Sequence, residues 1–511
     1  MSNYFICVGG TGARIGEAFV YLCASGYFGK GQTQIWIVDK DTQCGNGSTL
    51  HSAVNEYEAV RANCMWPDAP CFAQELSLNE WNFDDALKAL DPYATGDSPF
   101  GALARNDQQI QTVMSFLHDA ESLDNSMSRG FYGRAQTGTA LYKAIEQIPQ
   151  FFQGDGLFTS IRNDIAKGGT PPSVYLVGSS FGATGASLLP NMAKTLRQQF
   201  GNQVAIGAVL MLPYFSYATG NMEGGKPLVS PDTHWEKARE ALNYYGDPRR
   251  MSIRTIGSEV RGDATLDAFY IVGCDPIASI NFSFADGGTG QDNNPHISEL
   301  YAAMAGKHFF DLARNGDAGA PDAGIPATYA HCVSTGTSFT WQRIDPALVE
   351  PMLKLARFSL AALTFVHPLA NQNTPLVQDI TLQDCFGTSG MFGGKKARID
   401  EDEMKRNVKV VSDFSKRFLD YILFLVYTGP SVELFDWDFL VNLFERLNNL
   451  APQSETARPS RLRELTLKPD YTLSERMNVQ SLCQLRRFNA KNPDLQTVPT
   501  RFCFYQIGLC I

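Results

Sequence analysis

Apolar positions along residues 1–315 follow two alternating periods. Continuous apolar runs that stop at glycine or at acidic residues, such as NYFICVGG, TQIWIVDKD and AFYIVGCDP, are typical of buried strands. Between them, apolar residues recur at helical spacing, as in GARIGEAFVYLCASGYFG and GATGASLLPNMAKTLRQQF. Strands that alternate with helices predict an α/β fold, with a parallel sheet of about six strands covered by helices on both faces.

The pattern changes after a long apolar helix that we expect to begin near Asn294, because a loop rich in Gly, Ala and Asp follows it. We therefore expect a sheet domain at 1–290 with a helical insertion at 51–129, the long helix and its following loop at 291–321, and an α+β C-terminal domain with extra helices at 322–511. In that last domain we expect strands at 331–341 and 500–511, and helices at 346–366, 403–426 and 433–449.

Composition narrows the class of protein. The 511 residues carry a net charge of −10, which leaves no positive excess to neutralise nucleic-acid phosphates. Eleven cysteines are scattered without a CxxC pair, as expected for a reducing compartment rather than a disulfide framework. The longest apolar run near the C-terminus, FLDYILFLVY, is too short to span a bilayer. We expect a soluble cytoplasmic protein that binds no nucleic acid and has no membrane span.

Three glycine-rich loops stand at predicted strand–helix junctions, at Gly9–Gly12, Gly130–Gly138 and Gly178–Gly185. The carboxyl ends of parallel strands meet at one edge of a sheet, where open α/β sheets bind their ligands. Glycines there let backbone N–H groups approach phosphate, and the start of the following helix favours negative charge. The spacing predicts a phosphate-bearing ligand held by several loops.

Two common nucleotide-binding motifs match this sequence poorly or not at all. The dinucleotide fingerprint G-x-G-x-x-G matches at Gly10 and Gly12 but has Ile15 at the third position, although Asp39 stands where an acid would hold a ribose. A Rossmann-type NAD site therefore stays open as an alternative. The sequence contains no G-x-x-x-x-G-K-[ST], so a P-loop is not expected.

The loop SSFGATGAS resembles the glycine-rich signature GGGTG[ST]G of tubulin and FtsZ, with matches at Gly182, Thr184 and Gly185 and departures at Phe181, Ala183 and Ser187. The order of neighbouring motifs is also similar: VGGTGA, VDKDTQ, GFYGRAQTG, MLPYF, AFYIVGCDP and NNPHISELYAAMAG. The resemblance covers about residues 1–315 and is closest to the divergent bacterial tubulin-like group. It implies a tubulin/FtsZ-type GTP-binding domain with a long central helix, binding GTP or GDP with Mg²⁺ as a candidate cation.

The resemblance also implies roles for individual residues. Phosphates would be held by the glycine loops at Gly9, Gly10, Thr11, Gly12, Gly133, Arg134, Gly182, Ala183, Thr184 and Gly185. Asp39, Asp41 and Gln43 would lie near the ribose, the terminal phosphate or a metal ion, and Phe215 would line the sugar. Asp275, Asn294 and Glu299 are candidates for reading the guanine base.

In family members that polymerise, a loop after the central helix completes the active site of the neighbouring subunit. Asn315, Asp317 and Asp322 occupy the matching stretch here, with the second acid displaced by two residues. These residues are candidate catalytic groups that orient a water or a cation. The resemblance implies a candidate GTPase that self-assembles head-to-tail into a homo-oligomer or filament.

Two further alternatives belong to other functional classes. The departures at Phe181 and Ser187 are also compatible with a nucleotide-dependent scaffold that has a degenerate site and no hydrolysis. The segment GSSFG is similar to the G-x-S-x-G turn of serine hydrolases, with Ser180 as the nucleophile. That reading needs an acid and a histidine at later loop ends, whereas His296, His308 and His331 fall in or next to predicted helices or strands.

Overall fold

The computed structural model of the chain describes most of the first 363 residues and one later helix. The described residues are 2–65, 69–81, 83, 88, 100–101, 108–124, 130–131, 133–148, 151–218, 233–257, 264–275, 278–283, 288–315, 325–334, 340–363, 401–426, 428, 432 and 434. They divide into two compact units. Unit 1 comprises 1–19, 32–51 and 76–334, and unit 2 comprises 20–31, 52–75 and 335–511.

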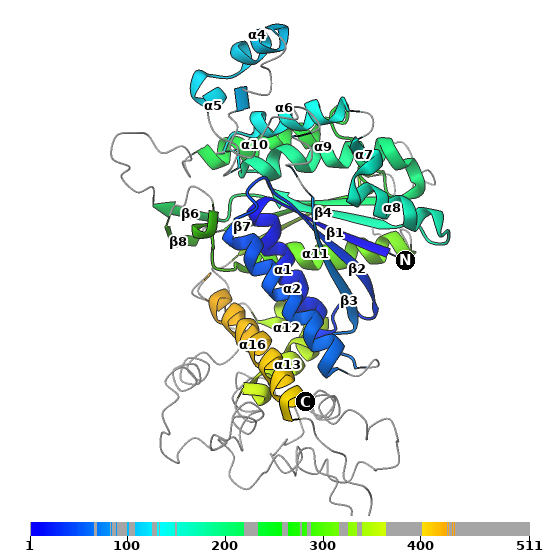
Figure 1. The fold of residues 1–511 in the computed structure, drawn as a ribbon, viewed down its shortest axis with the longest axis vertical. Helices are drawn as coiled ribbons and strands as arrows, with labels where there is room; N and C mark the ends of the chain where they lie inside the picture. The colour runs from blue at the N-terminus through cyan, green and yellow to red at the C-terminus, as the bar shows by residue number, and fades with distance from the viewer. Residues whose placement is uncertain are drawn as a thin grey trace, which may run out of the picture. The chain divides into compact units, whose positions relative to one another are not determined.

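Unit 1 is built on a seven-stranded parallel sheet in the order β3-β2-β1-β4-β5-β7-β9 (Figure 1). The strands are β1 (Ser2–Val8), β2 (Gly31–Val38), β3 (Gln74–Glu80), β4 (Ser173–Ser179), β5 (Ala205–Met211), β7 (Ala268–Asp275) and β9 (Thr328–Ser334). The predicted α/β class with a parallel sheet is confirmed, with seven strands where about six were expected. A separate parallel pair consists of β6 (Phe215–Ala218) and β8 (Ala278–Ser283).

Helices cover both faces of this sheet (Figure 1). On one face, α9 (Ala183–Phe200) packs on β1, β4 and β5, and α6 (Ala135–Glu146) packs on α9. On the other, α11 (Ile297–Asn315) packs on β4, β5 and β7. The first part of α1 (Gly9–Ser25) shares this second face, because Phe19 stacks on Phe5 with ring centroids 4.3 Å apart.

Side chains alternate in direction along the central strands, and this explains why the sheet has an apolar core on each face. Successive side chains of a strand point to opposite faces, so both faces must be apolar when helices cover both. In β1, Tyr4, Ile6 and Val8 belong to the core beneath α9. Phe5 and its neighbour Tyr175 in β4 face the other way, toward Gly306 of α11.

Two strands of the sheet come from segments that were not expected to belong to it. Residues 51–129 were expected to be a helical insertion, yet QELSLNE forms the edge strand β3. Its polar sequence is tolerated because an edge strand has a single neighbour in the sheet. Residues 331–341 were expected to be a strand of the C-terminal domain, whereas β9 ends at Ser334 and pairs with β7.

Unit 1 contains further helices besides α1, α6, α9 and α11. They are α4 (Gln108–Leu117), α5 (Ala120–Asp124), α7 (Phe151–Gly154), α8 (Gly156–Ala166) and α10 (His234–Gly246), with short 3₁₀ turns η2 (Gly201–Gln203) and η4 (Gly288–Gly290). At the start of α8, Asp155 accepts a hydrogen bond from the Phe158 amide at 3.1 Å and caps the helix.

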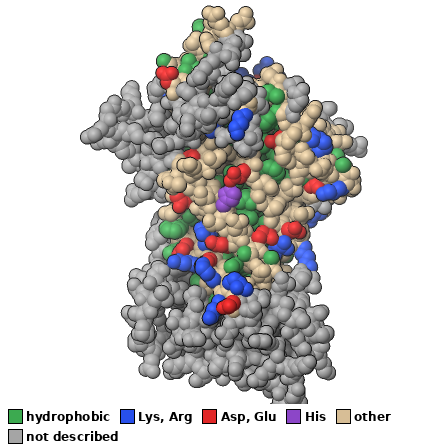
Figure 2. Space-filling view, viewed as in Figure 1, with side chains coloured by type: hydrophobic (Ala, Val, Ile, Leu, Met, Phe, Trp, Pro, Cys, Tyr) green, Lys and Arg blue, Asp and Glu red, His purple; other side chains and the backbone are tan. Residues whose placement is uncertain are grey.

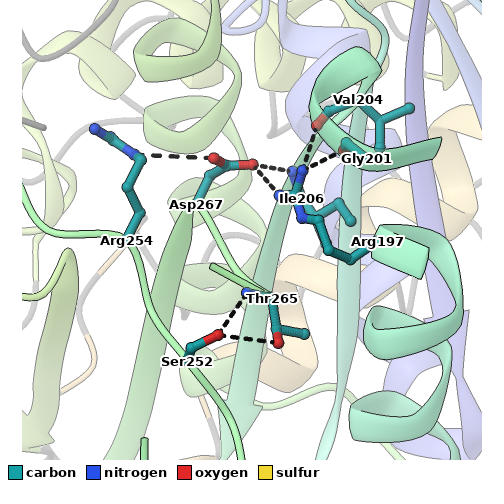
Figure 3. A network of polar contacts seen from close by, with 8 residues as sticks. All are labelled: Arg197, Gly201, Val204, Ile206, Ser252, Arg254, Thr265 and Asp267. Carbon is teal, nitrogen blue, oxygen red and sulfur yellow. Dashed lines mark hydrogen bonds and ion pairs between the residues drawn. The ribbon is translucent and has the colours of Figure 1, made fainter. Parts of the chain in front are cut away.

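A buried polar network fixes the amino-terminal edge of the sheet (Figure 3). Arg197 Nη2, near the end of α9, donates to Asp267 Oδ2 at 2.7 Å, and the same oxygen accepts from the Ile206 amide. The other Asp267 oxygen lies 3.9 Å from Arg254 Nε. This network ties α9 to the starts of β5 and β7, at the edge opposite the glycine loops.

Unit 2 is helical in its described part. It contains the second parts of α1 and of α2 (Gly45–Cys64), together with α12 (Trp341–Ile344), α13 (Pro346–Ala361) and α16 (Glu401–Val426). Tyr21 packs on Phe414, Phe418 and Tyr421 of α16. The helices expected at 346–366 and 403–426 are confirmed as α13 and α16. The helix expected at 433–449 and the strand expected at 500–511 lie outside the described residues.

The unit boundaries differ from the domain ranges expected from sequence. The C-terminal domain was expected to begin at 322, whereas the second unit resumes at 335 and also takes two short pieces from the first 75 residues. Within the described residues, no helix combines the length and hydropathy needed to cross a membrane. Acidic and basic side chains are intermingled over the coloured part of the face in Figure 2.

Candidate functional site

The strand order reverses direction between β1 and β4. From β1 the chain proceeds outward to β2 and β3, and from β4 it proceeds the other way to β5, β7 and β9. The helices that follow β1 and β4 therefore pack on opposite faces, and the loops that lead to them lie at the carboxyl edge, where open α/β sheets bind ligands. This edge is the candidate site.

The first glycine loop is the turn between β1 and α1. Gly9 has a φ of +74°, a conformation that glycine adopts without strain. A Cβ at Gly9 would lie 3.1 Å from the Thr184 Cβ and 3.4 Å from the Gly185 amide nitrogen. At Gly12, a Cβ would lie 2.7 Å from the carbonyl carbon of Cys7. The first loop thus contacts the second, and α1 starts directly against β1.

The second glycine loop connects β4 to α9. Gly182 is the N-cap of α9, in an extended conformation, and as a glycine it has no side chain to cap the helix. The first amides of a helix lack partners within the helix, so an uncapped start is suited to an anion. A Cβ at Gly185 would lie 2.7 Å from both the amide nitrogen and the carbonyl oxygen of Ser179. Glycine at 185 therefore permits α9 to pack on β4.

The third glycine loop precedes α6. Arg134 is the N-cap of α6, again without a side-chain cap, and its amide donates to the Phe131 carbonyl at 2.8 Å. A Cβ at Gly130 would lie 4.0 Å from the Asp41 Cβ, and one at Gly138 would lie 2.3 Å from Ser187 Oγ in α9. The three loops therefore meet at one edge of the sheet, as the sequence predicts.

Two acidic residues after β2 lie among these loops. Asp39 Oδ1 accepts from Thr184 Oγ1 and from the Asp41 amide, both at 3.3 Å. Burial raises the pKa of Asp39 to about 7, and the nearby Asp41 carboxylate adds to the rise, while hydrogen bonds lower it. Asp41 is buried and accepts from the amides of Gln43, at 3.1 Å, and Gly288, at 2.6 Å. Gln43 is exposed.

The start of α11 is held by a buried polar cluster. Arg14 Nε donates to Glu299 Oε1 at 2.6 Å, and Arg14 Nη2 donates to the Tyr214 hydroxyl at 2.5 Å. That hydroxyl also donates to Glu299 Oε1, while Glu299 Oε2 accepts from the His296 amide at 2.9 Å. His296 Nδ1 in turn accepts from the Ser298 amide, so the two side chains form a reciprocal cap.

The contacts within this cluster determine which of its side chains could still bind a ligand. Both Glu299 oxygens bond within the protein, and Arg14, Glu299 and Tyr214 are buried. Burial lowers the pKa of His296 to about 3, with a further decrease caused by Arg14, so the imidazole is neutral. The cluster fixes the positions of α1, α11 and the loop after β5.

The other residues expected to read the base or line the sugar lie near this cluster in the fold. Asp275 ends β7 and is exposed, and Asn294 precedes α11 and is also exposed. Phe215 is buried against Phe181, with ring centroids 5.7 Å apart, and the Arg14 guanidinium lies 5.5 Å from its ring centroid.

One of the three expected catalytic residues falls at the other end of α11. Asn315 is its last residue, whereas Asp317 and Asp322 lie outside the described residues. Ser180, the alternative nucleophile, is buried, and its hydroxyl donates to the Met211 carbonyl at 2.9 Å. A hydrolase nucleophile needs an exposed hydroxyl on a strained turn, and this geometry does not favour that role.

The sequence did not single out two charged residues of this region. Arg14 could have been noticed, because it and Glu17 are the two charged residues of an otherwise largely apolar helix. Lys237, in α10, donates from Nζ to the Gly133 carbonyl at 3.0 Å, and no local pattern marks it. Within the described part of the chain, no group of three or more His, Cys, Asp or Glu side chains has metal-binding geometry.

Comparisons with known proteins give no family assignment. No family model, curated protein or solved structure matches the chain.

Proposed function

We propose that this chain binds a guanine nucleotide, GTP or GDP, at the carboxyl edge of the sheet, where β1 and β4 end. The observation that carries the proposal is the meeting of three glycine loops at the switch point of the sheet. The starts of α6 and α9 have no side-chain caps and adjoin through Gly138 and Ser187. Backbone amides and helix starts of this kind suit a ligand with several phosphates.

Within this proposal, each loop contributes different contacts to the phosphates. Gly9, Gly10, Thr11 and Gly12 present amides from the β1–α1 turn, and the segment 182–185 presents the start of α9. Gly133 and Arg134 act from the third loop, where a guanidinium can pair with phosphate. Asp39 and Asp41 stand close to the same loops, and two acids beside phosphates call for a divalent cation such as Mg²⁺ between them.

The choice of guanine rests on the resemblance to tubulin and FtsZ. By that resemblance the long helix α11 would be the central helix, with Asn294 before its start as the candidate base-reading residue. Glu299, the other candidate on this helix, is buried with both carboxylate oxygens bonded within the protein. Asp275 and Phe215 remain candidates for the base and the sugar. Hydrolysis and head-to-tail self-assembly extend the proposal, with Asn315, Asp317 and Asp322 as the candidate catalytic residues.

A dinucleotide such as NAD is the second candidate. The order β3-β2-β1-β4-β5-β7 is the order of the classic dinucleotide-binding sheet, and Asp39 follows β2 where a ribose-binding acid would lie. Asp39 instead accepts from Thr184, which faces it toward the second glycine loop. A scaffold with a degenerate site is the third candidate.

The deciding experiment identifies the nucleotide directly. The purified full chain is denatured, its small molecules are separated by chromatography, and GTP, GDP, ATP and NAD are then titrated into nucleotide-free protein by calorimetry with Mg²⁺. We expect GDP or GTP in the extract and tighter binding of both than of ATP or NAD. Equal or stronger ATP binding would refute the guanine assignment, NAD would support the second candidate, and no binding would support the scaffold.

A further inference from the structure

The amino-terminal turn of α10 touches two of the three glycine loops. His234, the first residue of α10, packs on Phe181 with ring centroids 5.0 Å apart, and Phe181 directly precedes the α9 N-cap Gly182. Three residues later, Lys237 donates to the carbonyl of Gly133 in the third loop. Residues three apart share a helix face, so Lys237 stands on the side of α10 that meets the loops.

The environment of Lys237 is unusual for a lysine. The side chain is half-buried, and burial lowers its pKa, with no carboxylate among the causes. Among the described residues, Lys237 Nζ donates to the neutral carbonyl of Gly133. A lysine ammonium has three donors, so this contact leaves two for another acceptor.

The neighbours of Gly133 place this ammonium beside the two uncapped helix starts. Arg134, the next residue, is the N-cap of α6, and the Arg134 amide closes a turn back to Phe131. Through Gly138 and Ser187, the first turns of α6 and α9 are in contact. A ligand phosphate bound at these helix starts would therefore lie close to the Lys237 ammonium.

We propose that Lys237 is a phosphate-contacting residue of the candidate nucleotide site, supplying the ammonium charge that the missing P-loop lysine would otherwise provide. The inference rests on the proposed nucleotide binding and deepens it by assigning the ligand's charge a side-chain partner from α10. While one donor holds the Gly133 carbonyl, the others bond phosphate oxygens, so the third loop and the ligand are fixed together.

The test compares ligands that differ in charge. Wild type, Lys237→Met and Lys237→Arg full-length chains are titrated with GTP, GDP and guanosine at constant Mg²⁺. We expect Lys237→Met to weaken GTP and GDP binding by about tenfold or more, the size of one charge-assisted hydrogen bond, and guanosine by less than about twofold. Lys237→Arg should retain most of the affinity, because it keeps the charge.

A matched control is available on α9. Lys194 is also half-buried, and its Nζ donates to the Tyr244 hydroxyl of α10 at 2.5 Å, away from the glycine loops. Lys194→Met removes the same charge from a lysine that also contacts α10, and it should leave all three affinities unchanged. Circular dichroism and thermal midpoints establish that each variant is folded.

The outcomes separate this inference from the proposed function. A folded Lys237→Met chain that binds GTP as wild type does, or that loses guanosine as strongly as GTP, overturns the role of Lys237 and leaves nucleotide binding intact. An equal loss in Lys194→Met also overturns it, because a general charge effect would then be responsible. A wild-type chain that binds none of the three ligands overturns both proposals.

Discussion

Arg14 Nε and Glu299 Oε1 lie 2.6 Å apart, and this ion pair joins the second turn of α1 to the first turn of α11 across 285 residues of sequence. Both side chains are at least 96% buried. The Tyr214 hydroxyl and the His296 amide complete the bonding of the Glu299 carboxylate. One buried carboxylate therefore sets the positions of two helices that start at the candidate site.

Removing Arg14 alone should destabilise the protein strongly. Arg14→Met leaves the Glu299 charge buried without its partner, so the free energy of unfolding should fall by about 3–5 kcal/mol. Arg14→Met/Glu299→Leu should recover part of that loss, because no uncompensated charge remains. Urea unfolding of each variant measures these differences.

The surface pair Lys307–Asp311 serves as the comparison for this prediction. It lies on α11 with both side chains partly exposed, so Asp311→Asn should cost less than about 1 kcal/mol. If Arg14→Met costs no more than Asp311→Asn, the buried pair does not hold the two helices.

Two glycines of the second loop should respond differently to valine. A Cβ at Gly182 would meet only Ser179 Oγ, at 2.9 Å, and this hydroxyl can rotate away. Gly182→Val should therefore leave the fold stable and lower nucleotide affinity at least about tenfold, because the side chain blocks the start of α9. Gly185→Val should destabilise the fold by about 1–3 kcal/mol or more, since its Cβ meets the β4 backbone.

Thermal unfolding and nucleotide titration of the same preparations distinguish these effects. Gly47→Ala is the control, because a Cβ there has open space within 4 Å, and both stability and binding should stay near wild type. Normal nucleotide affinity in a folded Gly182→Val chain would mean that the second loop is only structural.

Asp39 should make stability depend on pH in the acidic to neutral range. Its pKa is about 7 in the folded chain and about 4 in an unfolded one. Between these values the folded state binds more protons, so the free energy of unfolding falls as pH rises from about 4 to 7 and the Asp39 contribution is constant above that. Asp39→Asn should remove this part of the decrease.

Urea midpoints of wild type and Asp39→Asn at several pH values between 4 and 8 test the prediction. The free energy of unfolding of Asp39→Asn relative to wild type should increase with pH and become constant above pH 7. A constant difference between wild type and Asp39→Asn across the range would contradict the raised pKa.

Hydrolysis of GTP, if head-to-tail assembly completes the active site, should rise faster than linearly with protein concentration. Asp317→Ala should preserve GTP binding and lower the concentration-dependent rate by about 10²–10⁴-fold, the usual contribution of a general base. Phosphate release measured over a range of protein concentrations reports both effects. A turnover per molecule that is independent of concentration, and that survives both Asp317→Ala and Asp322→Ala, would reject the shared active site.

The sequence alone determined the elements at the centre of the molecule. Apolar runs such as those of β1 and β4 are typical of strands covered on both faces, and the glycines near their ends mark where each loop begins. The α/β class and the three loops at one edge follow from this local pattern. Polar QELSLNE gave no such signal, so the edge strand β3 was not predicted.

Only the tertiary structure decided which side chains meet at that edge. Asp39 pairs with Thr184 and Arg14 with Glu299 because strands and helices far apart in sequence pack together, and no local pattern encodes such pairs. Lys237 is a similar case, since α10 brings it to Gly133 from 104 residues away. Hydrophobic periodicity fixes each element separately, whereas the partners of polar groups are chosen by the packing that buries them.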